Sequence, residues 1–192
     1  MKYSDSKFLQ AVYELIGTLY VTEFRVARNP ERAMAISAAL VELGEDRSWA
    51  SVWWAYGAIN HDLRDQACER ALVLLAKVEA PEQACAAALM LRAEIRFTQA
   101  IQSGDEPDQI EQAELLSEAV ALAPDWPNLC ARLARALHAA GDEQAARRHA
   151  MRAVALMEQA GPPEDPFDTA FTGTGLQSGW AAEELGALGL LR

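Results

Sequence analysis

A spacing of 34 residues recurs in the second half of the chain. Ala119 and Ala153 are 34 residues apart, and so are Leu122 and Leu156. The Gly-Asp pair at 141–142 lies between them and predicts a tight turn between two helices. A fixed period of this length is typical of arrays of helix–turn–helix units. Such arrays usually work by presenting a surface rather than by catalysing a reaction.

The composition favours helices throughout. Ala and Leu dominate, whereas Val, Ile and Thr are sparse. Apolar residues make up 51% of the 192 residues, which is enough to build a packed core and argues against a disordered chain. We therefore expect an all-α protein with one main domain.

Apolar residues at helical spacing, interrupted by Pro, Gly and Asn signals, divide the chain into eight helical segments. We expect helices over 4–28, 30–43, 49–60, 63–79, 81–102, 108–123, 127–140 and 142–160, paired in that order as antiparallel hairpins.

The Pro-rich stretch 161–166 ends the helical region. We therefore divide the chain into a helical repeat domain, 1–160, and a Pro/Gly-rich linker with a C-terminal helix, 161–192. That last helix contains Gly186 and Gly189, each of which costs about 1 kcal/mol relative to alanine. It would be unstable alone, but docked on the end of the array it would cap an exposed apolar face.

Residues 108–158 carry a pattern of small and large side chains that resembles tetratricopeptide repeats (TPR). That family places a large-small pair in its first helix, as at 133–134 here, and small residues in its second helix, as at Ala146 and Ala153. It ends the second helix with the Ala-x-x-Leu-x-Pro pattern found at 119–124. The resemblance implies a TPR-like right-handed α-solenoid of about four antiparallel helix pairs.

The resemblance also implies a function. TPR proteins commonly bind a peptide or helix on their concave face, as chaperones, adaptors or scaffolds. Residues 31–44 are similar to the first helix pair of some bacterial type III secretion chaperones, which are small, acidic, cytoplasmic members of the family.

The net charge of −11 argues against nucleic acid and anionic membranes as partners. The charge is uneven, because residues 125–160 carry five basic and four acidic side chains, whereas residues 161–192 carry one basic and five acidic.

No stretch is apolar enough to span a membrane or to serve as a signal peptide. Three widely spaced cysteines fit buried thiols in a reducing compartment, so we expect a cytoplasmic location.

Four polar residues in 127–140 follow helical spacing and predict a binding face. They are Asn128, Arg132, Arg135 and His138. In TPR proteins the corresponding face lines the groove, and Asn, Lys and Arg there clamp a ligand carboxylate, which suits the planar fork of arginine. The alternative is a solvated helix face whose cations pair with Glu94 or Glu118 on a neighbouring helix.

An aromatic cluster at 49–56 has two interpretations. Trp49, Trp53 and Tyr56 share one helical face and form either a binding platform or, as we favour, part of the core. Trp54 lies beside that stripe and is the best candidate for an exposed peptide contact.

The sequence gives little support for metal binding or for catalysis. His61, His138, His149 and the cysteines show none of the close pairs that structural zinc sites need, so we expect no metal and no cofactor. No nucleophile elbow or Ser/His/Asp arrangement is visible, so we do not expect an enzyme.

We expect a cytoplasmic adaptor or chaperone that holds a protein or peptide segment on its concave face. The alternative is a structural subunit that self-associates, for example as a homodimer, with the C-terminal tail packed in its own or a neighbour's groove. A helical enzyme or small-ligand sensor is a third and weaker hypothesis.

Overall fold

The computed structural model describes residues 48–61, 65–160, 171–172 and 178–191. Within these residues the chain forms seven α-helices and no strand, so the described part is all-α. The helices are α3 (Ser48–His61), α4 (Asp65–Leu75), α5 (Glu82–Ser103), α6 (Gln109–Leu122), α7 (Pro127–Ala139), α8 (Glu143–Gln159) and α9 (Ser178–Ala187).

The helices expected between residues 49 and 160 are confirmed, with small changes at their ends. The predicted first pair, 4–28 with 30–43, and the linker at 161–170 lie outside the described residues. The helix predicted at 63–79 is shorter in the structure, where α4 ends at Leu75. Hydrogen bonds such as the one from Lys77 N to Leu74 O (3.1 Å) then form a tighter turn in place of a further α-helical turn. The C-terminal helix ends at Ala187, and Gly189 with φ of +72° then turns the chain away.

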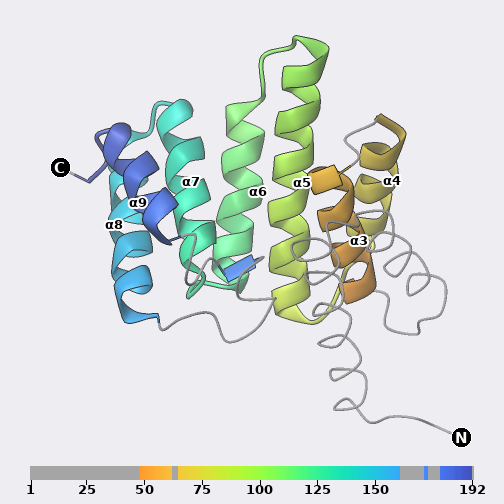
Figure 1. Cartoon of the computed structure of the whole chain (residues 1–192), viewed down its shortest axis with the longest axis horizontal. Helices are drawn as coiled ribbons and strands as arrows, with labels where there is room; N and C mark the ends of the chain where they lie inside the picture. Colours follow the sequence, from red (N-terminus) through yellow and green to blue (C-terminus); the bar gives the residue numbers. More distant parts are fainter. Residues whose placement is uncertain (1–47, 62–64, 161–170, 173–177, 192) are drawn as a thin grey trace, which may run out of the picture.

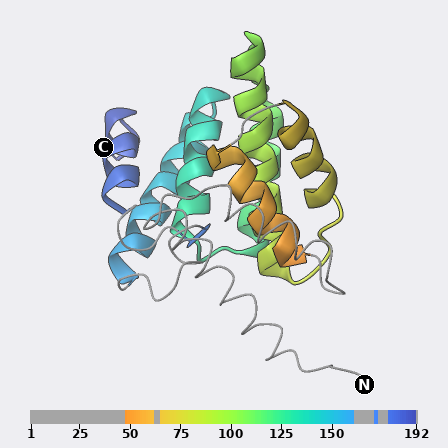
Figure 2. The same ribbon diagram turned by 45° about the vertical axis from the view of Figure 1, so that its right-hand side comes forward.

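The helices follow one another across the molecule in chain order. α5, α6, α7 and α8 stand side by side, and each packs against the next (Figure 1). α3 packs against both α4 and α5, while α9 lies against α7 and α8, as both views show (Figures 1 and 2). Within the described residues, neighbours in sequence are therefore neighbours in space.

Short polar signals fix the two hairpin turns. Asp108 caps α6, because its Oδ1 accepts hydrogen bonds from the backbone N–H groups of Ile110 (3.0 Å) and Glu111 (2.9 Å). Asp142 caps α8 through the N–H of Ala145 at 3.0 Å. Gly141 precedes it with φ of +87°, a conformation that favours glycine, so the predicted turn at 141–142 is confirmed.

Alanines line the contact between α7 and α8. Ala134, Ala146 and Ala153 are completely buried, as their expected role at a close helix contact requires, and Ala150 is completely buried as well. Small side chains let the two helix axes approach closely, since no bulky group separates the backbones. Larger apolar residues, such as Ile95 and Leu133, fill the space between successive helices.

His149 on α8 gives the protein a predicted acid sensitivity. Its Nδ1 atom is buried without a hydrogen-bond partner among the described residues. Burial lowers the pKa of His149 below 6.5, and the nearby cations of Arg148 and Arg152 lower it further. Because the unfolded chain then binds a proton at a higher pH than the folded chain does, the free energy of unfolding falls as the pH drops below 6.5.

We expect His149→Gln to remove this part of the acid sensitivity. Urea unfolding at about pH 7.5 and at about pH 5 measures it in both proteins, since the two conditions bracket the usual titration of histidine. The unaltered chain should lose more stability on acidification than the variant. Equal losses in the two proteins would contradict the assignment.

None of the helices among the described residues combines the length and the apolar character that are needed to cross a membrane.

Candidate functional site

The predicted polar face of α7 exists, and each of its four side chains has a partner. Asn128 is 4% exposed, and its Oδ1 accepts a hydrogen bond from Nε of Arg132 at 3.2 Å. This bond across one helical turn confirms that the two residues share a face. The Nδ2 of Asn128 donates to the backbone carbonyl of Phe171 at 3.2 Å and to Sδ of Met90 at 3.8 Å. A buried amide is thus used to hold a backbone carbonyl from the C-terminal segment.

Arg132 joins α7 to α5. Its guanidinium donates to the carboxylate of Glu94, so the alternative pairing with that residue is confirmed. The side chains of Arg132 and Glu94 are 23% and 30% exposed, and the pair is therefore partly desolvated. Burial, together with Arg135, lowers the pKa of Arg132 to about 10, while Tyr56 and Glu184 act in the opposite direction. The group stays cationic at neutral pH.

Arg135 and His138 extend the same face toward α9 and α8. Nη1 of Arg135 donates to Oε1 of Glu184 on α9 at 3.0 Å, and the two side chains are 32% and 29% exposed. Nδ1 of His138 lies 2.6 Å from Oε1 of Glu143, an ion pair when the imidazole is protonated. Two of the predicted clamp residues, Asn128 and Arg135, are therefore engaged by the chain's own C-terminal segment.

The aromatic stripe of α3 surrounds Phe171. The ring centroid of Phe171 lies 5.0 Å from that of Trp53, 5.4 Å from Tyr56 and 6.3 Å from Trp49, in edge-on or tilted arrangements. Trp53 and Phe171 are 3% and 0% exposed, so the favoured core interpretation is confirmed for Trp53. We call Trp49, Trp53, Tyr56 and Asn128 together the Phe171 site.

The expectation that Trp54 is an exposed contact is wrong. Trp54 is only 6% exposed, and the guanidinium of Arg70 on α4 lies 5.0 Å from its ring centroid. The helix α3 is apolar on nearly every side, because it packs against both α4 and α5. A step off the stripe therefore turns Trp54 toward α4 rather than toward solvent.

Phe171 and Glu184 are the site residues that sequence analysis missed. Both belong to the segment interpreted as linker and capping helix. The available signals were a few large apolar side chains within a Gly- and Thr-rich stretch, Phe171 among them, and the contrast between an acidic tail and the more basic residues 125–160. Neither signal specified where the tail would dock.

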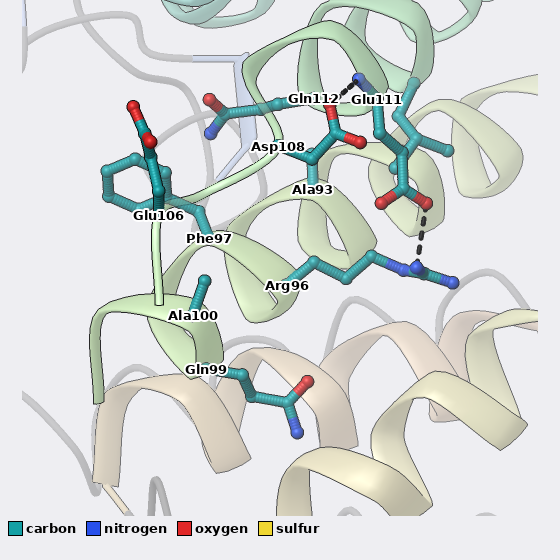
Figure 3. A pocket seen from close by; sticks show the side chains of 10 residues that line it. Ala93, Arg96, Phe97, Gln99, Ala100, Glu106, Asp108, Glu111 and Gln112 are labelled. Carbon is teal, nitrogen blue, oxygen red and sulfur yellow. Dashed lines mark hydrogen bonds and ion pairs between the residues drawn. The ribbon is translucent and has the colours of Figure 1, made fainter. Parts of the chain in front are cut away.

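A hollow lies between α5 and α6, away from the Phe171 site. It has a volume of about 300 Å³, and Figure 3 shows Arg96 of α5 reaching Glu111 of α6, while Phe97 of α5 lies beside Glu106 at the other side of the hollow. Arg96 pairs with Glu111 at 2.8 Å, with 48% and 37% of their side chains exposed, and Asp108 is occupied in capping α6. Its polar groups are thus largely solvated or already used, which makes it a weaker candidate than the Phe171 site.

The thiols do not form a reactive cluster. Cys68 and Cys130 are buried, as expected, and Cys85 is partly buried. Burial raises the pKa of both Cys85 and Cys130, which disfavours their thiolate forms. Within the described residues, no group of three or more His, Cys, Asp and Glu side chains is arranged to hold a metal ion.

Comparisons with known protein families, with characterised proteins and with solved structures found no match to this chain.

Proposed function

We propose that this chain is a TPR-like binding protein that holds a segment of a partner polypeptide on the face formed by α3, α5 and α7. The pairs α3–α4, α5–α6 and α7–α8 would be three of about four hairpins in a right-handed solenoid. Three features support this arrangement: packing in chain order, the buried alanines of the last hairpin, and direct bonds between α5 and α7.

The observation that carries the proposal is the way Phe171 is bound. Its ring is enclosed by three aromatic side chains of α3, and its carbonyl accepts a hydrogen bond from Asn128 of α7. A pocket for one side chain combined with a donor for the backbone is the chemistry by which grooves recognise polypeptides. The same chemistry suits a segment of another protein that carries an aromatic residue.

The free energy that each interaction contributes indicates its role in binding. Full burial of a phenylalanine side chain contributes about 1.5–3 kcal/mol. An ion pair as exposed as Arg135–Glu184 contributes about 0.2–1 kcal/mol. Affinity would therefore come mainly from the aromatic anchor, while Arg135 favours an acidic segment and sets its direction, since Arg132 is already paired with Glu94.

A peptide selection tests this function. Random peptides of about fifteen residues, long enough to reach several pockets of a groove, would be selected on the full chain carrying Phe171→Ala, which empties the pocket. We expect the recovered peptides to share an aromatic residue with a nearby carboxylate, and to lose binding when Asn128→Ala is added. Arg96→Ala, at the hollow between α5 and α6, is the matched control and should leave binding intact.

Two outcomes would contradict the proposal. One is a selection that recovers no peptide above background. The other is binding that survives Asn128→Ala but is lost with Arg96→Ala, which would assign the binding site to the hollow between α5 and α6.

Self-association is the second candidate function, and the docked C-terminal segment favours it as well. A segment held by noncovalent contacts can be exchanged between identical copies. Light scattering over a range of concentrations separates the candidates, because exchange predicts a dimer that is lost with Phe171→Ala, whereas an adaptor stays monomeric in both forms.

A further inference from the structure

The described part of the C-terminal segment fills both anchor points of the proposed binding face. Phe171 is completely buried among the rings of α3, and Glu184 pairs with Arg135 of α7. A second aromatic side chain has no room in the Phe171 site while Phe171 occupies it. A second carboxylate would likewise have to compete with Glu184 for Arg135.

Charge also matches the segment to its position. Residues 161–192 carry one basic and five acidic side chains, whereas residues 125–160 carry five basic and four acidic. The described part of this acidic segment, α9, packs against α7 and α8 of the more basic stretch, and Glu184 pairs there with Arg135. A partner that uses the same contacts would share that chemistry.

We infer that the C-terminal segment is an intramolecular ligand that competes with the partner. The partner would be an acidic segment whose aromatic side chain replaces Phe171 and whose carboxylate replaces Glu184. This inference rests on the proposed function. Binding in trans would then require release of the tail, so the unaltered chain is held in a self-blocked state.

The contacts of the tail are suited to a reversible block. α9 spans only Ser178–Ala187 and contains Gly186, which weakens a helix. Leu185 and Leu190 are buried, but the pair between Glu184 and Arg135 is about one-third exposed. A tethered ligand acts at an effective concentration on the order of millimolar. A segment with a dissociation constant of about 10 µM in trans would therefore reduce access about a hundredfold.

The test measures binding of the chain's own tail in trans. The probe is a fluorescein-labelled synthetic peptide with the sequence of residues 165–192, and fluorescence anisotropy gives its apparent dissociation constant for the full chain. Glu184→Arg opposes docking of the tail because it places a cation against Arg135, and the partly exposed position leaves the core intact. Glu183→Arg makes the same charge change at an exposed neighbouring position of α9 and is the matched control.

We expect Glu184→Arg to bind the probe about fivefold to tenfold more tightly than the unaltered chain, while Glu183→Arg behaves like the unaltered chain. Adding Arg135→Glu to Glu184→Arg should remove the gain. The reversed pair restores docking of the tail, and the carboxylate of the probe then faces a like charge.

Equal, measurable affinities for all these chains would overturn competition by the tail and leave the proposed function standing. Failure of the probe to bind any chain would overturn both. Light scattering on the same samples adds a third outcome. A dimer of the unaltered chain that dissociates with Glu184→Arg would assign the tail to a neighbouring copy, and so would contradict an intramolecular block.

Discussion

Replacing Trp53 with alanine is expected to lower the free energy of unfolding by about 3–5 kcal/mol. Trp53 is 3% exposed, and its ring packs edge-on against Tyr56 at 5.7 Å and Phe171 at 5.0 Å. Its removal leaves a cavity between α3 and the C-terminal segment. Urea unfolding followed by circular dichroism measures the loss, and the labelled tail peptide should lose its affinity for the Glu184→Arg chain when Trp53→Ala is added.

Val73→Ala is the control for this substitution. Val73 is also a large apolar residue, on the neighbouring helix α4, but it is 57% exposed. Its truncation should change stability by no more than about 0.5 kcal/mol. A Trp53→Ala chain that loses less than about 1 kcal/mol would contradict the packing described for α3.

Replacing Phe171 with alanine is expected to release α9 while leaving the rest of the described helices folded. Loss of a fully buried phenylalanine costs about 3 kcal/mol or more, which corresponds to at least about a hundredfold in a docking equilibrium. Hydrogen exchange should therefore show backbone amides of α9 with at least about a hundredfold less protection, while those of α5 to α8 keep theirs.

Leu191→Ala is the matched control for Phe171→Ala. Leu191 also belongs to the C-terminal segment, but it is 36% exposed, so its truncation should leave the protection of α9 nearly unchanged. If α5 to α8 lost protection together with α9 in the Phe171→Ala chain, Phe171 would be an integral part of the core rather than a docked anchor.

The helices could be predicted because their signals are local. Periodic apolar residues and the polar caps Asp108 and Asp142 each act within a few residues of the chain, so six expected segments between 49 and 160 are found as helices. The close contact of α7 with α8 was also predictable. The small size of the side chains at 134, 146 and 153 can be read from the sequence itself, and small side chains let two helices approach closely.

The docking of the tail could not be predicted because it depends on contacts between distant parts of the chain. Asn128 and Phe171 are 43 residues apart, and Arg135 and Glu184 are 49 residues apart. Helical spacing placed Asn128, Arg132 and Arg135 on one face, but it contains no information about what covers that face. The error at Trp54 has the same origin, since periodicity within α3 does not say that α4 lies on its other side.

Photo-crosslinking at the aromatic anchor tests the central claim most directly. The labelled tail peptide would carry p-benzoylphenylalanine in place of its Phe171 and would be irradiated with the full Glu184→Arg chain, and mass spectrometry would map the linked residues. The claim that the face of α3, α5 and α7 binds polypeptide segments predicts crosslinks within Ser48–His61 and around Asn128. Crosslinks confined to the hollow beside Phe97, or spread without preference over the surface, would contradict it.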